Sequence, residues 1–244
     1  MKVSFHWLKD YVRIGSSADQ IADRLTQAGL KVEAIKTVSG DTIFETEVTT
    51  NRPDWLSHLG VACEIHAITG CRFSVPPFRY QGKRESKKSI KISLPNLDLC
   101  PYYSAVLLEG VEWGKTPDFM KQRLEACGIR SVNLIVDITN YVLLEWGQPL
   151  HAFDLDRLQG DFIAARHAQT GESIVAIDGT SYKLTKDDLV ITDARGPVAI
   201  GGVMGGRESE VDERTKNILL ESAFFATSAI RATRRKLGLS SESS

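Results

Sequence analysis

The sequence has few cysteines, and their spacing excludes two kinds of site. Four cysteines are scattered over 244 residues, without a CxxC pair or a Cys/His spacing that suits zinc. Such scatter is typical of reduced cytoplasmic thiols rather than of a disulfide framework. We therefore expect a cytoplasmic protein without a structural metal.

Long apolar runs and an excess of either charge are missing too. No apolar run approaches the roughly 20 residues of a membrane-spanning helix, and the opening residues MKVSFHWLKDYV are too polar for a signal peptide. We expect a soluble protein with no membrane partner. A net charge of −1 gives no global attraction for nucleic acid, so any RNA contact must come from local patches.

The common catalytic motifs are absent. The sequence has no GK[ST] phosphate loop, no GxGxxG after a first strand, no GxSxG turn and no carboxylate pair at a known spacing. The sequence therefore does not favour a nucleophilic triad. If this chain hydrolyses anything, we expect a positioned water to attack a bond that is already labile.

A proline pair and a charged stretch divide the chain. Pro76-Pro77 cannot continue a helix, and residues 81–89 (QGKRESKKS) lack periodicity. We predict a first domain over residues 1–76, a linker over 77–90 and a second domain over 91–244. In the first, Ser16 or Ser17 caps a helix that ends at Gly29, two strands follow, and a second helix ends at Gly70.

The second domain mixes strands and helices without strict alternation. Thr116 is expected to cap a helix that has Pro117 at its first position, and residues 133–146 to form another helix. Residues 172–185 are predicted to form a hairpin around Asp178-Gly179, PVAIGGVM one strand, and residues 227–237 a basic helix. The expected class is α+β, with a mixed sheet in the larger domain.

Polar residues gather in the otherwise apolar stretch 133–154, namely Asp137, Thr139, Asn140, Gln148 and His151. Burying so many polar groups is unfavourable unless they bond to one another or to a ligand. A lone histidine is usually structural, but Thr139 and Asn140 favour a water-handling role for His151.

Two further segments are unusual. Four glycines at positions 201–206 allow either a backbone cradle for a ligand or a plain sheet bend. Glu221 interrupts the apolar run ILLESAFF, and a buried carboxylate needs a partner. That partner is either an arginine of the protein or a ligand hydroxyl or amine. Together with residues 133–154, these segments predict one pocket.

Two basic features could touch phosphate. Lysines and an arginine in the linker are more typical of a solvated segment. The last predicted helix carries four basic side chains, for which RNA contact and plain solvation remain open: Arg231, Arg234, Arg235 and Lys236.

The sequence resembles the N-terminal part of the β subunit of bacterial phenylalanyl-tRNA synthetase. The matching blocks cover nearly the whole chain in family order, and they include TEVTTNRPDWLSHLGVACEIHAITG, SVNLIVDITNYVLLEWGQPLHAFDLDRL and PVAIGGVMGGRESEVDERTKNILLESAFF. QPLHAFD and GGVMGG are highly specific. The resemblance implies a winged-helix-like domain over residues 1–76 and an editing domain after residue 90, which hydrolyses tyrosine mistakenly attached to phenylalanine tRNA.

The resemblance also implies roles for single residues. Glu221 would recognise the tyrosine hydroxyl, while the others would line the site and position the ester and a water. By motif match these are Thr139, Asn140, His151, Gly202 and Gly205. Ser241 and Ser243 fall where the family has a Thr-Glu-Ala stretch at the pocket wall, and these serines change its size and polarity.

The chain also departs from the family. Only a short turn stands where the family commonly carries an inserted OB-fold for tRNA. The chain ends at Ser244, so we interpret it as a fragment or short form of the β subunit, which contributes to phenylalanyl-tRNA formation by editing. No cofactor is expected in this chain. ATP, Mg²⁺ and the α subunit of a heterotetramer belong to the whole enzyme, with tRNA(Phe) as substrate. The alternative is a non-catalytic scaffold that binds RNA or the α subunit.

Overall fold

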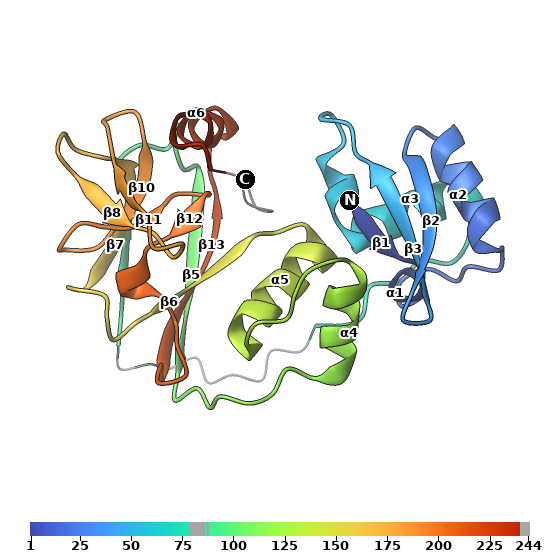
Figure 1. The fold of residues 1–244 in the computed structure, drawn as a ribbon, viewed down its shortest axis with the longest axis horizontal. Coiled ribbons are helices and arrows are strands. Elements are labelled where there is room, and N and C mark those ends of the chain that lie inside the picture. The colour runs from blue at the N-terminus through green and yellow to red at the C-terminus, as the bar shows by residue number, and fades with distance from the viewer. Residues whose placement is uncertain (79–85, 87, 240–244) are drawn as a thin grey trace. The chain divides into compact units, whose positions relative to one another are not determined.

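The computed structural model describes residues 1–78, 86 and 88–239, which fall into two compact units. The first unit comprises Met1–Gly82 and Gly114–Gln148, and the second comprises Lys83–Trp113 and Pro149–Ser244. The units therefore do not follow the chain in order: residues 114–148 pack with the N-terminal part (Figure 1). They differ in this one segment from the predicted division at residues 77–90.

The first unit surrounds a small antiparallel sheet with the strand order β1-β3-β2. Its elements are β1 (Lys2–Ser4), α1 (Phe5–Leu8), α2 (Ala18–Gln27), β2 (Lys31–Val38), β3 (Asp41–Glu47), a 3₁₀ turn (Pro53–Leu56), α3 (His58–Thr69), α4 (Asp118–Ala126) and α5 (Leu134–Trp146).

Local signals placed several of these elements correctly. Ser17 caps α2 in a capping box with Gln20, and Gly29 follows the helix at φ +107°. Gly70 ends α3 in the left-handed conformation, and Asn133 caps α5 by accepting from Val136 N–H. The helix prediction for residues 133–146 is thus confirmed.

The predicted cap at Thr116 is wrong. Pro117 occupies the N-cap of α4 without a side-chain bond, because the Thr116 hydroxyl donates instead to Asp137. Asp137 is fully buried and also accepts from the Ser131 hydroxyl at 2.6 Å and Val132 N–H at 2.9 Å. Its role is therefore structural, and it joins the loop before α5 to the helix.

Helix α5 packs against the core of the first unit. Its Tyr141 and Leu144 lie against a buried cluster that includes Trp7 and Leu25. His58 of α3, fully buried, donates from Nδ1 to the Leu144 carbonyl at 2.8 Å. These contacts explain why residues 114–148 belong to the first unit.

The second unit is built mainly of strands. Its elements are β4 (Lys91–Ser93), β5 (Tyr102–Glu109), β6 (Leu150–Asp154), β7 (Phe162–His167), β8 (Ser173–Val175), β9 (Ser181–Lys183), β10 (Leu189–Thr192), β11 (Pro197–Ile200), β12 (Met204–Gly205), a 3₁₀ turn (Arg207–Ser209), β13 (Asn217–Phe224) and α6 (Thr227–Leu237).

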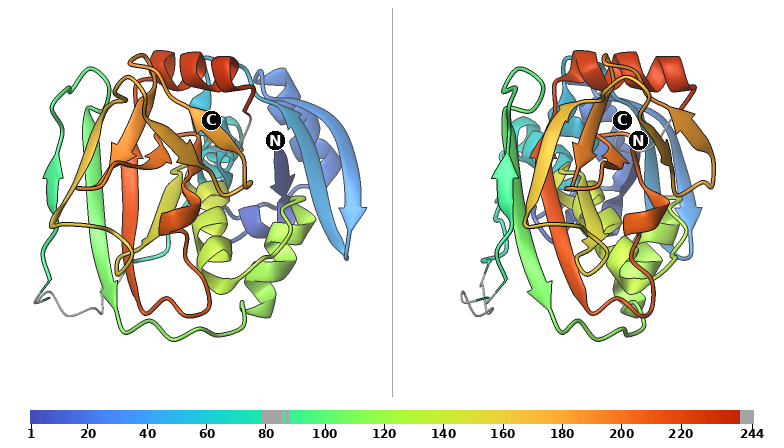
Figure 2. Two further views of the ribbon diagram at one scale, coloured as in Figure 1. Left: turned by 60° about the vertical axis from the view of Figure 1, so that its left-hand side comes forward. Right: turned by 90° about the vertical axis from the view of Figure 1, so that its left-hand side faces the viewer.

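Two sheets of the second unit enclose its main core. A five-stranded sheet has the order β12-β11-β10-β7-β4, and a three-stranded sheet has the order β5-β13-β6. Phe153 and Leu219 from the smaller sheet share a buried cluster with Ile163 and Leu189 from the larger one. Val190, the neighbour of Leu189 on β10, belongs instead to a second cluster that includes Leu237 of α6. Helix α6 lies at one end of these strands (Figures 1 and 2).

The fold is a mixed α+β arrangement with several sheets, as predicted. The larger sheet is mixed, because β4 pairs with β7 in parallel and the other strand pairs are antiparallel. The predicted single strand PVAIGGVM is corrected to two strands, β11 and β12, joined by a turn at residues 201–203. Among the described residues, no helix combines the length and apolarity needed to cross a membrane.

Candidate functional site

The candidate site lies on the three-stranded sheet of the second unit, where β13 is the central strand. Glu221 of β13 pairs directly with His151 of β6 and with Ala105 of β5. Directly opposed residues of an antiparallel pair point to the same face, with Cβ atoms about 4.5–5.5 Å apart. The carboxylate and the imidazole are therefore neighbours, on the face that carries Phe153 and Leu219 into the core.

Glu221 is buried without a counter-charge. The residue is 7% exposed, and no arginine or lysine pairs with it in the part of the chain that the structure describes. Its Oε2 atom has no hydrogen-bond partner there. Of the two partners considered from the sequence, the arginine is thus not found. Burial raises the pKa of Glu221 to about 7, an effect that the neighbouring Tyr103 hydroxyl partly offsets.

His151 is enclosed in the same way. Its Nε2 atom is buried and lacks a partner within the described ranges, and its ring meets Phe153 edge-on at a centroid distance of 4.4 Å. Burial lowers the pKa of His151 to about 4. The imidazole is consequently neutral near pH 7, so one ring nitrogen is free to accept a proton or a hydrogen bond.

Gly205 provides the wall beside the imidazole. A Cβ atom at this position would lie 2.4 Å from His151 Cε1 and 2.8 Å from Nε2, distances that no side chain tolerates. Strand β12 can therefore approach His151 this closely only with glycine at position 205.

Gly202 serves the turn that precedes β12. It adopts φ +68°, and Val203 N–H closes the turn on the Ile200 carbonyl at 3.0 Å. A side chain at Gly202 would meet Ile230 of α6 and Phe225. Gly202 thus makes a tight bend, and Gly205 brings backbone against a candidate site residue. The backbone cradle for a ligand stays a prediction.

Two of the remaining predicted residues belong to the first compact unit. Thr139 and Asn140 lie on α5 in the first unit, where the Thr139 hydroxyl donates to the Val136 carbonyl at 2.8 Å, so their part in the site stays a prediction. Ser241 and Ser243 lie outside the described residues. The structure therefore brings together Glu221, His151 and Gly205, with Gly202 at the adjoining turn.

Sequence reasoning missed two neighbours of Glu221. Burial raises the pKa values of Tyr103 on β5 and of Cys100 just before it, and the nearby Glu221 carboxylate adds to both rises. Only the register of β5 against β13 places the phenol near the acid.

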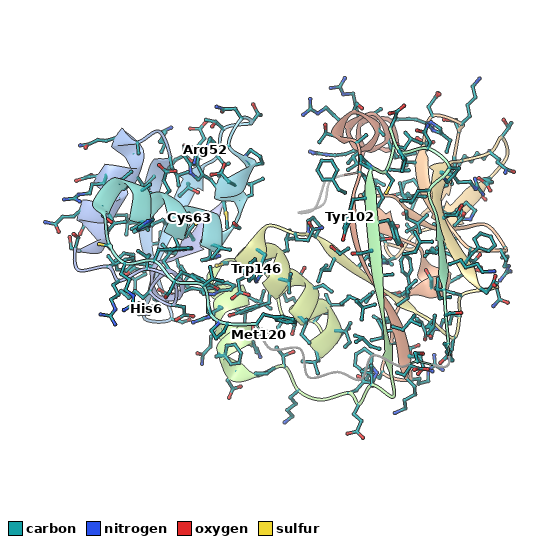
Figure 3. All side chains as sticks on the ribbon, turned by 180° about the vertical axis from the view of Figure 1, so that it is seen from behind. His6, Arg52, Cys63, Tyr102, Met120 and Trp146 are labelled. Atoms are coloured by element: carbon teal, nitrogen blue, oxygen red, sulfur yellow. The ribbon has the colours of Figure 1, made fainter. Side chains whose placement is uncertain are left out.

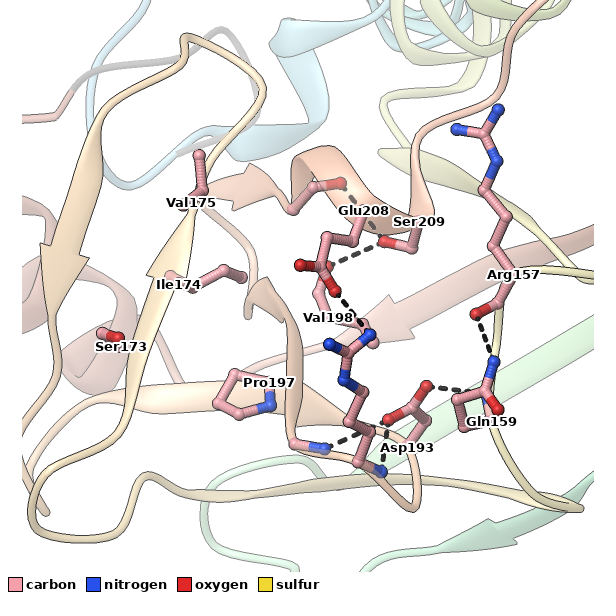
Figure 4. Close-up of a pocket in the computed structure, with 13 residues that line it drawn as sticks. Arg157, Gln159, Ser173, Ile174, Val175, Asp193, Pro197, Val198, Glu208 and Ser209 are labelled. Atoms are coloured by element: carbon pink, nitrogen blue, oxygen red, sulfur yellow. Dashed lines mark hydrogen bonds and ion pairs between the residues drawn. The ribbon is translucent and has the colours of Figure 1, made fainter.

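The second unit also has a cavity of about 280 Å³, and none of the predicted site residues lines it. Gly206, the neighbour of Gly205, lines it together with Asp193, Val198 and Ser209 (Figure 4). Two of its buried polar side chains are already hydrogen-bonded: Asp193 accepts three backbone N–H groups, and the Ser209 hydroxyl donates to the Val198 carbonyl. The unpaired atoms of Glu221 and His151 mark the better candidate.

Comparison with known proteins places the chain in a family. The sequence model of the B3/4 domain matches residues 99–244. The phenylalanine–tRNA ligase beta subunit of Rhodopirellula baltica is 42% identical over 100% of this chain and 36% of its own length. That of Geobacter sulfurreducens is 47% identical over 84% of this chain and 26% of its own length. The chain thus spans about a third or less of these curated relatives.

A solved structure supports the fold. A crystal structure of an N-terminal fragment of the phenylalanyl-tRNA synthetase beta subunit from Pyrococcus horikoshii aligns with a TM-score of 0.50 and 16% identity, over 100% of this chain and 73% of that one. At this identity the likeness concerns the fold alone. The sequence matches decide the family: this chain belongs to the B3/4 domain family and is a homologue of the phenylalanine–tRNA ligase beta subunit.

Proposed function

We propose that this chain edits mischarged tRNA, by hydrolysing tyrosine attached to phenylalanine tRNA. The observation that carries the proposal is the pair formed by Glu221 and His151, two buried side chains on opposed strands with unpaired polar atoms. Buried polar groups of folded proteins are nearly always hydrogen-bonded. A ligand that bonds both groups accounts for their presence.

The carboxylate supplies a way to select tyrosine. A pocket shaped for phenylalanine rejects an analogue with one extra hydroxyl only weakly, by about 100-fold. In a second site, Glu221 accepts a hydrogen bond from the phenol of tyrosine. Phenylalanine leaves the buried acid unpaired, at about 1–3 kcal/mol or more. The site therefore binds the tyrosyl group in preference to the phenylalanyl group, so that the mischarged ester is the one removed.

The imidazole supplies a way to handle water. Neutral His151 can orient a water molecule or take its proton as the water attacks the ester carbonyl. The aminoacyl ester is already activated, so a covalent nucleophile is not required. Thr139 and Asn140 are proposed to position the ester and the water, Gly202 and Gly205 to shape the site, and Ser241 and Ser243 to form its wall.

The rest of the proposal follows from the family. Residues 1–76 would be a winged-helix-like domain, 77–90 a linker and 91–244 the editing domain. We propose that the whole enzyme is a cytoplasmic heterotetramer with an α subunit, that it uses ATP and Mg²⁺ outside this chain, and that tRNA(Phe) is the RNA partner.

Deacylation of tyrosyl-tRNA(Phe) by the purified chain tests the function. We expect hydrolysis above the buffer rate, and His151→Ala to slow it about 10²–10⁴-fold as expected for loss of a general base. Glu221→Ala should reduce the preference for tyrosyl over phenylalanyl ester roughly 5- to 150-fold. His167→Ala, which removes an exposed imidazole of the same unit, is the matched control and should hydrolyse normally.

A calorimetric titration with free tyrosine separates this function from the scaffold alternative. Saturable binding of tyrosine, with phenylalanine bound more weakly, supports an editing pocket. If tyrosine does not bind and the ester decays at the buffer rate, the editing function is wrong and the scaffold remains.

A further inference from the structure

Tyr103 places a second phenol beside the acid that is proposed to recognise a phenol. The residue is 7% exposed, and its hydroxyl has no hydrogen-bond partner among the described residues. On β5 it pairs with Ala223 of β13, two residues from Glu221. Alternate residues of a strand share a face, and such diagonal neighbours lie within reach of an aromatic side chain.

Unpaired buried polar atoms concentrate at this point. Within the described ranges only five side chains carry such an atom, and three of them, Tyr103, His151 and Glu221, lie on one face of the same sheet. The other two are Trp7 and Thr233. A phenylalanine at position 103 would fill the same space without leaving a hydroxyl unsatisfied, so packing alone does not account for tyrosine.

We propose that Tyr103 is a positioning residue, whose hydroxyl donates to one oxygen of Glu221 and so directs the other oxygen at the phenol of the substrate. The inference rests on the proposed editing function and deepens it. A carboxylate accepts several hydrogen bonds at once, so the resident phenol and the bound phenol do not exclude each other.

The geometry needs only a small adjustment. Tyr103 lies close enough to Glu221 to interact with it, although the pair does not meet hydrogen-bond geometry. The terminal torsion of a glutamate is broad. The proposed bond therefore requires a rotation of the carboxylate about its Cγ–Cδ bond, which is a torsion of low energy.

The interaction also tunes the charge of the acid. Burial raises the pKa of Glu221 to about 7, and the Tyr103 hydroxyl opposes that rise. The other titratable groups around the acid are His151 from β6 and Cys100 before β5. Neutral His151 adds no charge near pH 7, and the pKa of the Cys100 thiol is raised to about 11. The bond from Tyr103 thus favours the ionised acid, the form that accepts most strongly from a phenol.

Tyr103→Phe tests the inference in the full chain, with Tyr102→Phe as the matched control. Tyr102 is the next residue of β5, points to the opposite face of the sheet and is 62% exposed (Figure 3). The first readout is the Glu221 titration, followed by ¹³C NMR of its carboxyl carbon. We expect Tyr103→Phe to raise the midpoint by about one to two pH units, the size of a hydrogen bond to a charged group, and Tyr102→Phe to leave it unchanged.

The second readout is the affinity for free tyrosine. At pH 7 Tyr103→Phe should weaken binding about tenfold, since fewer molecules carry the ionised acid, and the difference should shrink as the pH rises above the new midpoint. A purely structural loss would weaken binding equally at every pH.

The interaction between Tyr103 and Glu221 can also be tested in the wild-type protein. The Tyr103 Cζ resonance should shift at the same midpoint as the Glu221 carboxyl carbon. The role of Tyr103 is wrong if these two resonances shift at different pH values. It is also wrong if Glu221 has the same midpoint in Tyr103→Phe and Tyr102→Phe. Neither readout uses RNA, so a chain that fails to hydrolyse the ester but shows the linked titration contradicts only the editing function.

Discussion

At the scale of single residues, Glu221 reduces the stability of the fold in which it sits. Its pKa rises from 4.5 to about 7 on burial. Between these two values the unfolded chain releases the proton that the folded chain retains. Raising the pH through this window therefore favours unfolding. The penalty is absent below pH 4.5 and complete above pH 7.

Glu221→Gln should consequently stabilise the protein in a pH-dependent way. We expect little difference from wild type at pH 4.5 and a gain on the order of 3 kcal/mol at pH 8, because the amide never ionises. Urea denaturation of both proteins at the two pH values measures it.

Glu172→Gln is the control of opposite sign. Arg166 lowers the pKa of Glu172, and the two side chains form an ion pair at 2.7 Å in the same unit. This variant should lose stability at pH 8 rather than gain it. If Glu221→Gln changes the free energy of unfolding by the same amount at pH 4.5 and at pH 8, burial does not raise the pKa of Glu221.

At the scale of elements, the sequence indicates where most helices and strands begin and end. Helix ends are set by residues close to them in the sequence, namely Ser17, Gly29 and Asn133. Such local effects can be predicted from the sequence. The prediction that Thr116 caps a helix failed for a non-local reason, because its hydroxyl donates to Asp137, which is 21 residues away in the sequence. Strand β6, at Leu150–Asp154, was not predicted because a five-residue strand after a proline carries little signal.

The site depends on register, which the sequence does not reveal. Glu221 and His151 are 70 residues apart in numbering, and a shift of one residue between β6 and β13 would send their side chains to opposite faces. The sequence could therefore identify both residues as candidates, but only the fold shows that they are opposed. Tyr103 was not a candidate from the sequence, and its place beside Glu221 depends on the register of β5 against β13.

His58 shows how one side chain fixes an element that is distant in sequence. Its Nδ1–H donates to the Leu144 carbonyl of α5, its Nε2 accepts from Ser4 N–H at 3.0 Å, and its ring stacks on Trp7 at 4.0 Å. This arrangement requires the neutral imidazole. Burial lowers the pKa of His58 to about 4, so its contribution to stability is complete above pH 6.5 and is lost as the pH falls towards 4.

His58→Phe should keep the stacking on Trp7 and lose both hydrogen bonds. We expect a loss of about 2–5 kcal/mol at pH 7, since two buried backbone groups are left unpaired. The loss should shrink near pH 4, where wild type is destabilised by protonation of His58 itself. Denaturation at both pH values, with signals from the first unit, measures this.

His66→Phe provides the control on the same helix. His66 is exposed and makes one hydrogen bond, from Nδ1 to the Cys71 carbonyl at 2.6 Å, so its removal should reduce stability by about 0.5–1.5 kcal/mol, less than the loss expected for His58→Phe. A loss for His58→Phe that is the same at pH 7 and pH 4 would contradict the assigned protonation state.

At the scale of the whole molecule, two features shape what the chain can bind. The first is the course of the chain, which leaves the first unit after Gly82, returns to it at Gly114 and leaves it again after Gln148. The predicted site residues are divided accordingly, with Thr139 and Asn140 in one unit and His151 and Glu221 in the other. This division could not be read from composition, because Pro76-Pro77 marks only the first crossing.

The second feature is charge. The formal net charge of −1 gives no general attraction for RNA, so the proposed tRNA substrate must be held by local groups. Helix α6 offers two: Arg231 and Arg235 are exposed, one turn apart, and form no ion pair among the described residues. Ile230 of the same helix lies against Gly202, which places α6 beside the candidate site.

Arg231→Ala/Arg235→Ala should therefore weaken the binding of uncharged tRNA(Phe) and flatten its dependence on salt. Each lost phosphate contact lowers the slope of log K against log salt by roughly 0.7–0.9, so two contacts predict a change of about 1.5. Fluorescence anisotropy at several salt concentrations measures it. Lys31→Ala/Lys36→Ala is the matched control, because it changes net charge equally but removes lysines that are already paired with glutamates. Equal slopes for the two double variants would mean that α6 does not contact the RNA backbone, and that another surface must hold the tRNA.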